Sequence, residues 1–118
     1  MTVADDLLAM ERKFWTEGAA FFRDHADASC LVAFTSMTAV MNKDELAATV
    51  KNAPRWRGLD MEIKGVVTPQ PDLTILSYRA SAERADGKRY RALVSSAYAK
   101  RPDGWKLAFH QQTPLDGG

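Results

Sequence analysis

Apolar residues recur at helical spacing at the start of the chain. Between positions 3 and 25 they lie three or four residues apart, which is the period of one face of an α-helix. Gly18 interrupts this stretch, and glycine disfavours helix interiors, so we predict a long first helix and a short second one. One acid, Glu11, lies on the apolar stripe. The stripe also carries four aromatic side chains: Phe14, Trp15, Phe21 and Phe22.

A third helix is predicted after two brief extended segments at residues 30–35 and 39–41. Asn42 can accept a hydrogen bond from a free amide of the first turn, and Glu45 stands three positions later, the spacing of a capping box. Leu46 and Val50 supply the buried side of this helix. Pro54 is predicted to end it.

The remaining pattern predicts antiparallel strands. Apolar and polar residues alternate, with interruptions, over residues 59–68, 73–85, 88–100 and 105–113. Asp86-Gly87 is typical of a two-residue hairpin turn. Helices followed by consecutive strands indicate the α+β class.

Length and charge restrict the function classes. The chain has 118 residues, which fits one domain over residues 1–118 with a core from about 4 to 114. Sixteen basic and fifteen acidic residues give a net charge of +1, so no strong positive field favours nucleic acid or an anionic membrane. Neither a membrane-length apolar run nor a signal peptide is visible, and we expect a cytoplasmic protein. With Cys30 as the single cysteine, we expect no disulfide, metal or cofactor.

Strand pairing across the predicted turn assigns side chains to the two faces of the sheet. With a two-residue loop, Tyr78 faces Ser95 and Ile75 faces Tyr98. The face predicted to lie against the helices then carries large apolar groups together with the polar Arg79, Ser96 and Gln111. Apolar walls with a few convergent polar groups are typical of a small-molecule pocket.

The chain resembles the nuclear transport factor 2-like superfamily, especially its small bacterial polyketide cyclase-like and ketosteroid isomerase-like members. The resemblance rests on the aromatic first helix, the Asn42 helix start and the run Tyr98-Ala99-Lys100-Arg101-Pro102-Asp103-Gly104-Trp105-Lys106-Leu107. It implies a cone-shaped α+β barrel, in which N-terminal helices pack on a curved, mainly antiparallel sheet around a cavity. Many members are homodimers.

We expect a pocket for an apolar or aromatic compound that bears an acidic or carbonyl group. Arg79 is the predicted anion clamp, with a salt bridge to Glu11 as the alternative. The predicted ligand contacts are Arg79, Ser96, Gln111, Tyr98, Phe109, Trp15, Phe34 and Trp56; Trp56 is expected to act as a lid over the pocket or to fill a dimer interface.

Two alternatives remain open: an acid/base enzyme of cyclase, dehydratase or isomerase type, and an association module with a vestigial cavity. An enzyme would use His110 or Tyr98 to carry a proton. No Asp or Glu falls on the predicted inner sheet face, and Phe109 and Gln111 occupy the positions where some members carry histidines, so both departures weigh against the enzyme.

His110 is assigned to the outer face of the sheet, unless a bulge near Trp105 turns it inward. That outer face is the predicted homodimer surface. Its predicted contact residues are Tyr78, Ser95, His110 and Gln112.

Overall fold

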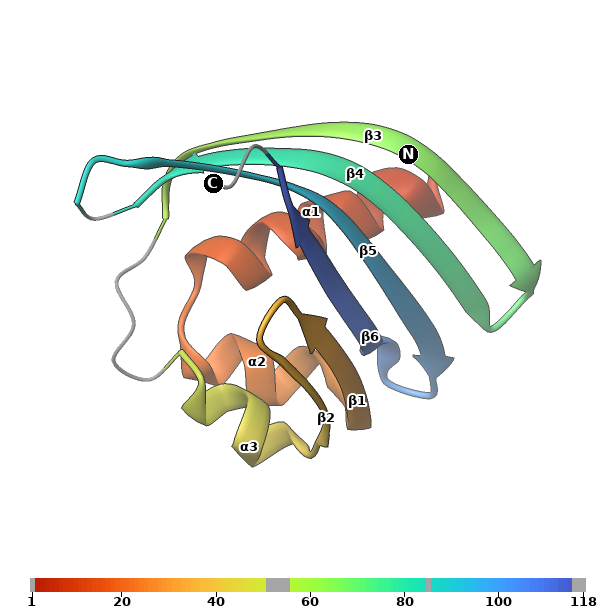
Figure 1. Cartoon of the computed structure of the whole chain (residues 1–118). Helices are drawn as coiled ribbons and strands as arrows, with labels where there is room; N and C mark the ends of the chain where they lie inside the picture. The colour runs from red at the N-terminus through yellow and green to blue at the C-terminus, as the bar shows by residue number, and fades with distance from the viewer. Residues whose placement is uncertain (1, 51–55, 85, 116–118) are drawn as a thin grey trace.

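The computed structural model describes residues 2–50, 56–84 and 86–115, and these form three helices and a six-stranded sheet (Figure 1). The predicted α+β class is confirmed. The elements in chain order are α1 (Val3–Thr16), α2 (Ala19–His25), β1 (Ala26–Phe34), β2 (Met37–Met41), α3 (Lys43–Ala48), β3 (Arg57–Gln70), β4 (Leu73–Glu83), β5 (Arg89–Arg101) and β6 (Gly104–Pro114).

The helices begin and divide where local chemistry predicts. Gly18 is the N-cap of α2 and separates it from α1. The Asn42 side chain accepts from the Glu45 amide at 2.8 Å, and the Glu45 carboxylate accepts from the Asn42 amide at 2.9 Å, which confirms the predicted capping box of α3. Pro54 lies outside the described residues.

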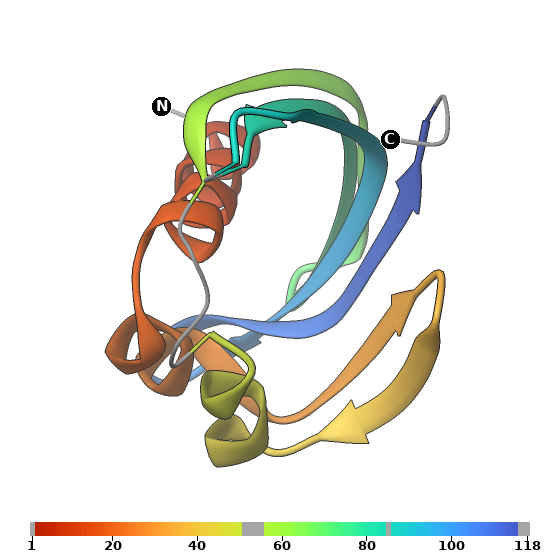
Figure 2. The same cartoon turned by 60° about the vertical axis from the view of Figure 1, so that its left-hand side comes forward.

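The sheet curves over the helices. Its strand order is β2-β1-β6-β5-β4-β3, with β1 and β6 parallel and every other neighbouring pair antiparallel. Figure 2 shows the sheet arching so that its concave side faces α1, with α2 and α3 at the lower end. Because the side chains of α1 fill the hollow of this arch, the helix stripe and the concave sheet face share one core.

The predicted register of the β4–β5 hairpin is wrong by one residue. The last pair is Glu83 with Arg89, where a two-residue turn would continue the pairing closer to Asp86-Gly87, and Tyr78 pairs with Val94. A slip of one residue exchanges the two faces of a strand. Tyr78 therefore lies on the concave face with no exposed surface, and Arg79 lies exposed on the convex face.

A bulge in β6 changes a second face assignment. Ala97 pairs with Phe109 but Tyr98 pairs with Leu107, which leaves Ala108 as the extra residue. Leu107 and His110 consequently both face the concave side, as the bulge alternative anticipated for His110.

These two corrections also change the predicted faces of Phe109, Gln111 and Gln112. Phe109 and Gln111 pair with residues on the convex side, opposite to the prediction. Tyr78 and Gln112, predicted for the dimer surface, lie on the concave side with His110, whereas Ser95 lies on the convex side as predicted. No helix in the described ranges is long and apolar enough to cross a membrane.

Candidate functional site

A cavity of about 710 Å³ opens between the helices and the concave face of the sheet. Three aromatic side chains from separate parts of the chain form one wall. Trp56 lies 5.4 Å from Trp15 and 5.1 Å from Tyr90, measured between ring centroids. Offset and edge-on ring contacts at such distances stabilise the packing of a rigid wall.

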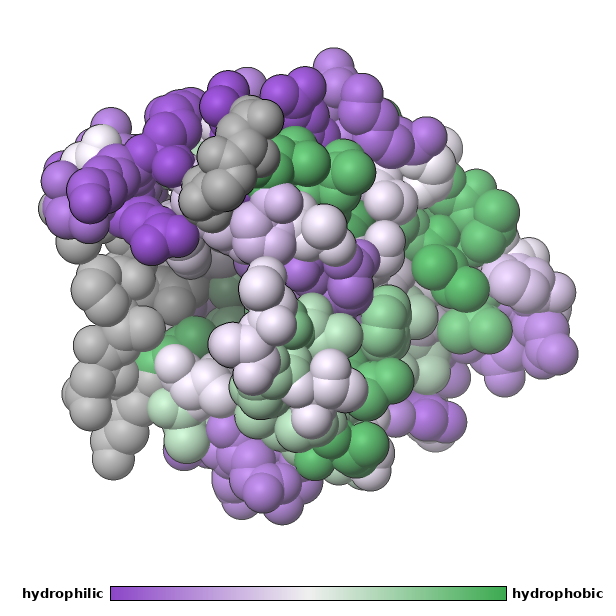
Figure 3. All heavy atoms as spheres, in the orientation of Figure 1, coloured by the Kyte–Doolittle hydropathy of each residue, from purple (hydrophilic) through white to green (hydrophobic). Residues whose placement is uncertain are grey.

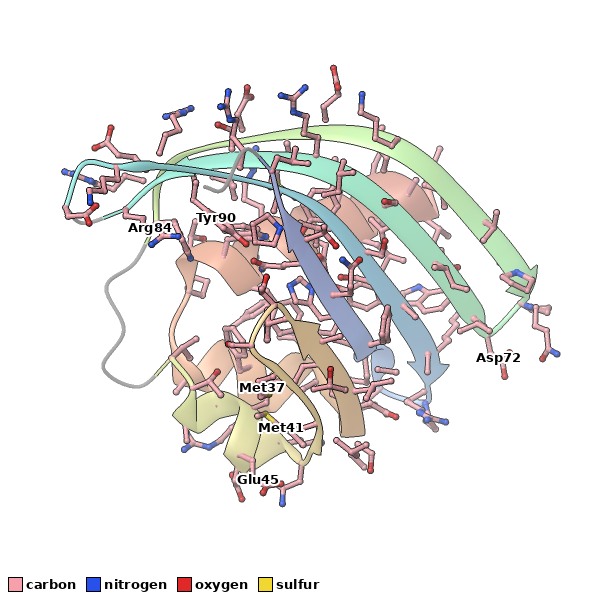
Figure 4. The ribbon with its side chains drawn as sticks, in the orientation of Figure 1. Met37, Met41, Glu45, Asp72, Arg84 and Tyr90 are labelled. Carbon is pink, nitrogen blue, oxygen red and sulfur yellow. The ribbon has the colours of Figure 1, made fainter. Side chains whose placement is uncertain are left out.

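The opposite wall is aliphatic and sulfur-containing. Figure 4 shows Met37 and Met41 on β2, across the cavity from Arg84 and Tyr90 at the far end of the β4–β5 hairpin. Leu46 of α3 and Val32 of β1 continue this wall. Unbranched methionine side chains adapt to the shape of what they contact, so this wall can accommodate varied apolar ligands.

A fully buried carboxylate lies beneath the cavity. Glu11 projects from the apolar stripe of α1 and has no exposed surface. Its Oε1 accepts from the Tyr78 hydroxyl at 2.6 Å and the Ser96 hydroxyl at 2.8 Å, and its Oε2 accepts from the Tyr98 hydroxyl. Burial, reinforced by the neighbouring carboxylate, raises the pKa of Tyr78 and of Tyr98 well above the usual range, so both phenols remain neutral donors.

His110 connects this carboxylate to the cavity. Its Nδ1 lies 2.8 Å from Ser96 Oγ and 3.7 Å from Glu11 Oε1, and its Nε2 lies 3.0 Å from the Gln112 side-chain nitrogen. His110 lines the cavity, and its side chain is 13% exposed. Burial lowers the pKa of His110 below its usual value, and the Glu11 charge acts in the opposite direction. The imidazole is therefore neutral at pH 7 and can accept a proton.

A cation borders the entrance to the cavity. The Arg84 guanidinium lies 5.1 Å from the Tyr90 ring centroid and 5.8 Å from that of Trp56. The Tyr90 hydroxyl donates to the Gln112 side-chain oxygen at 2.8 Å. Arg84 is the one lysine or arginine among the described residues that line the cavity.

The structure brings together six of the nine site residues predicted from the sequence. Trp15, Phe34 and Trp56 line the cavity beside His110. Ser96 and Tyr98 lie below it, both fully buried against Glu11.

Three predicted ligand contacts lie away from the cavity because of the two register corrections. Phe109 and Gln111 are on the convex face, and Gln111 bonds there to Thr113. Arg79 borders a small convex recess with Asp60, Glu62, Ser81 and Arg91. The alternative salt bridge between Arg79 and Glu11 is therefore wrong as well.

Sequence reasoning missed Glu11 as a site member, and it also missed Tyr90 and Arg84 in the cavity lining. For Glu11 the signal was present, because an acid at an apolar position of a helix stripe must find buried hydrogen-bond donors. Within the described ranges, no group of three or more His, Cys, Asp or Glu side chains could hold a metal ion.

Neither a family model nor a curated protein matches the chain. Among solved structures, a putative ketosteroid isomerase from Parabacteroides distasonis matches with a TM-score of 0.81 and 14% identity, over 98% of this chain and 89% of that one.

Two other solved structures show the range of proteins with this architecture. An NTF2-like protein of unknown function from Prochlorococcus matches with a TM-score of 0.77 and 16% identity, over 97% of this chain and 94% of that one. A putative calcium/calmodulin-dependent protein kinase type II association domain from Thiobacillus denitrificans matches with a TM-score of 0.74 and 19% identity, over 98% and 96%. The chain has the nuclear transport factor 2-like fold, as its resemblance predicted.

The lowered pKa of His110 predicts how stability depends on pH. The folded protein binds this proton less readily than the unfolded chain, whose histidines titrate near 6.5. The free energy of unfolding should therefore fall as pH decreases from 7 to 5, because the unfolded state takes up protons first. Urea unfolding at several pH values measures this slope.

The second histidine provides the control. Burial also lowers the pKa of His25, so it contributes its own part of the slope. His110→Gln should reduce the slope and leave the His25 part, and the double variant with His25→Gln should be nearly flat above pH 5. An unchanged slope in His110→Gln would contradict the assignment.

Proposed function

We propose that this domain binds a small apolar or aromatic molecule in the cavity. The observation that carries the proposal is the combination of a cavity of about 710 Å³, lined mainly by aromatic and aliphatic groups, with a few polar side chains at one end. Ligand sites typically have about 300–1,000 Å³ and this distribution of polarity.

The polar groups indicate how such a ligand lies. His110, Gln112 and Tyr90 form one hydrogen-bonded set at the cavity wall. Arg84 stands at the entrance, so an acidic group on the ligand, if it carries one, is best placed there. The ring system of the ligand then lies between the wall of Trp15, Trp56 and Tyr90 and the two methionines.

Placing a larger side chain in the cavity should weaken binding. The neutral fluorescent probe 1-aminoanthracene is expected to bind saturably to the native protein. Met41→Trp places an indole against the cavity wall, and overpacking costs about 1–3 kcal/mol, so affinity should fall about tenfold or more.

The matched control is Leu93→Trp, because Leu93 is 42% exposed on the convex face and pairs there with Arg79. It should leave probe affinity unchanged. Equal affinity in native protein and Met41→Trp would show that the probe does not occupy this cavity.

A second candidate function is acid/base catalysis, which is favoured by the contacts of His110 with Ser96 and Glu11. A general base needs a partner that holds its ring, and here Ser96 and Glu11 hold the Nδ1 side while Nε2 lies on the cavity side. Once the substrate displaces the Gln112 amide from Nε2, the Nε2 lone pair would take a proton from a carbon next to a carbonyl, and the electron pair of that C–H bond would move to the carbonyl oxygen. Glu11, 3.7 Å from Nδ1, would stabilise the resulting imidazolium.

Exchange of carbon-bound protons tests this second function without knowledge of the natural substrate. In D₂O, the native protein should accelerate deuterium incorporation next to the carbonyl of 2-tetralone, followed by NMR. In His110→Gln the rate of deuterium incorporation should fall by about 10²-fold or more, because a general base typically contributes at least that factor. His25→Gln is the matched control and should retain it; no acceleration by native protein argues against this function.

A row of apolar side chains crosses the convex face and supports self-association. Neighbouring strands contribute one residue each, and every member pairs with the next in register: Val40, Leu31, Phe109, Ala97, Ile75 and Val67. Figure 3 shows hydrophobic atoms where the outer strands curve downward, beside the hydrophilic surface above them. We propose that two copies pair through this row, in place of the predicted set of Tyr78, Ser95, His110 and Gln112.

Charge in the row should disrupt the homodimer. Native protein should sediment as a dimer at micromolar concentration, whereas Leu31→Lys should sediment as a monomer, since an uncompensated charge would be buried between the copies. Ala20→Lys, on the exposed side of α2, is the control. A native monomer would contradict the proposal.

A further inference from the structure

A continuous chain of hydrogen bonds runs from the cavity entrance to the buried carboxylate. It passes from Tyr90 to Gln112 at 2.8 Å, from Gln112 to His110 at 3.0 Å, from His110 to Ser96 at 2.8 Å and from Ser96 to Glu11 at 2.8 Å. Each of the middle three groups contacts one neighbour on either side. The orientation of one proton in the chain therefore determines that of the next.

At the buried end of the chain, Glu11 determines which atom donates in each hydrogen bond. Its Oε1 accepts two hydroxyl protons, from Tyr78 and Ser96. The single hydroxyl proton of Ser96 is thus used, and Ser96 Oγ can only accept from His110 Nδ1. Tyr78 fits the same scheme, because its oxygen accepts the indole proton of Trp15 at 2.9 Å and its own proton is free for Glu11.

The hydrogen bonds at the Tyr90 end of this chain independently give the same position for the imidazole proton. Tyr90 donates to the side-chain oxygen of Gln112, which turns the amide nitrogen of Gln112 toward His110 Nε2. An amide nitrogen only donates, so Nε2 must accept. A neutral imidazole carries one proton, and both ends of the chain place it on Nδ1.

From this position of the proton we infer that the cavity selects ligands whose inner end is a hydroxyl donor, namely a phenol or an enol, which replaces the Gln112 amide at His110 Nε2. The inference rests on the proposed small-molecule function and deepens it. A flat ring fits against Trp15, Trp56 and Tyr90, and the hydroxyl proton then meets His110 Nε2, which is an acceptor in this hydrogen-bond chain.

A ligand carbonyl group next to His110 Nε2 is unfavourable. Its oxygen and Nε2 are both acceptors, and neither can supply the missing proton. Turning the imidazole proton to Nε2 would leave Nδ1 and Ser96 Oγ as two facing acceptors, since the Ser96 proton is held by Glu11. The carbonyl part of the ligand predicted from the sequence is therefore disfavoured next to His110.

Three ligands of one shape test the selection by titration calorimetry: 2-naphthol donates, 2-methoxynaphthalene has no proton to donate, and 2-naphthaldehyde only accepts. We expect 2-naphthol to bind about tenfold or more tightly than the other two, because it alone can take the place of the Gln112 amide as the donor to His110 Nε2. His110→Leu, which keeps an apolar wall, should bind all three alike.

The outcomes separate the inference from the proposed function. If none of the three ligands binds, the proposed function fails and the selection fails with it. If all three bind native protein equally well, the proposed function stands and the selection is refuted.

The proton position can also be measured without any ligand. The ¹⁵N spectrum of the neutral side chain distinguishes a protonated from an unprotonated ring nitrogen, and the chain has two histidines, so His25→Gln assigns the signals. We expect Nδ1 of His110 to carry the proton. A proton on Nε2 would overturn the inference even if 2-naphthol were preferred.

Discussion

The Glu11 carboxylate is the constraint on which the rest of the structure depends. A fully buried carboxylate costs several kcal/mol unless donors surround it, and hydrogen bonds to a charged group each return about 1.5–3 kcal/mol. Those donors, Tyr78, Ser96 and Tyr98, come from β4 and β5. These hydrogen bonds to Glu11 therefore fix the position of α1 against the concave face of the sheet.

The chemistry of the cavity follows from this attachment and from one bulge. Without the extra residue Ala108, His110 would point away from Glu11, and the cavity would lack its proton acceptor. With the bulge, His110 hydrogen-bonds to Ser96, and Ser96 hydrogen-bonds to Glu11. A structural carboxylate thus also orients the imidazole, so the stability of the core and the polarity of the site are set by one group.

Much of the fold was predictable because its determinants are local. The Gly18 break, the Asn42–Glu45 cap and the alternation of the strands each depend on a few neighbouring residues, and the structure confirms them. The site was less predictable. Trp15, Phe34 and Trp56 do line the cavity, whereas Arg79, Phe109 and Gln111 do not, because each lies beyond a register that a single residue decides.

By itself, the sequence determined the order of the elements, the α+β class and the presence of one acid in an apolar helix face. Only the tertiary structure decided which strand faces line the cavity and which hydroxyls meet Glu11. The physical reason is that side chains alternate with a period of two along a strand, so one residue more in a connection or a bulge reverses a whole face. The bulge in β6 and the length of the β4–β5 connection depend on how the sheet curves over α1, and the local alternation of apolar and polar residues does not reveal that curvature.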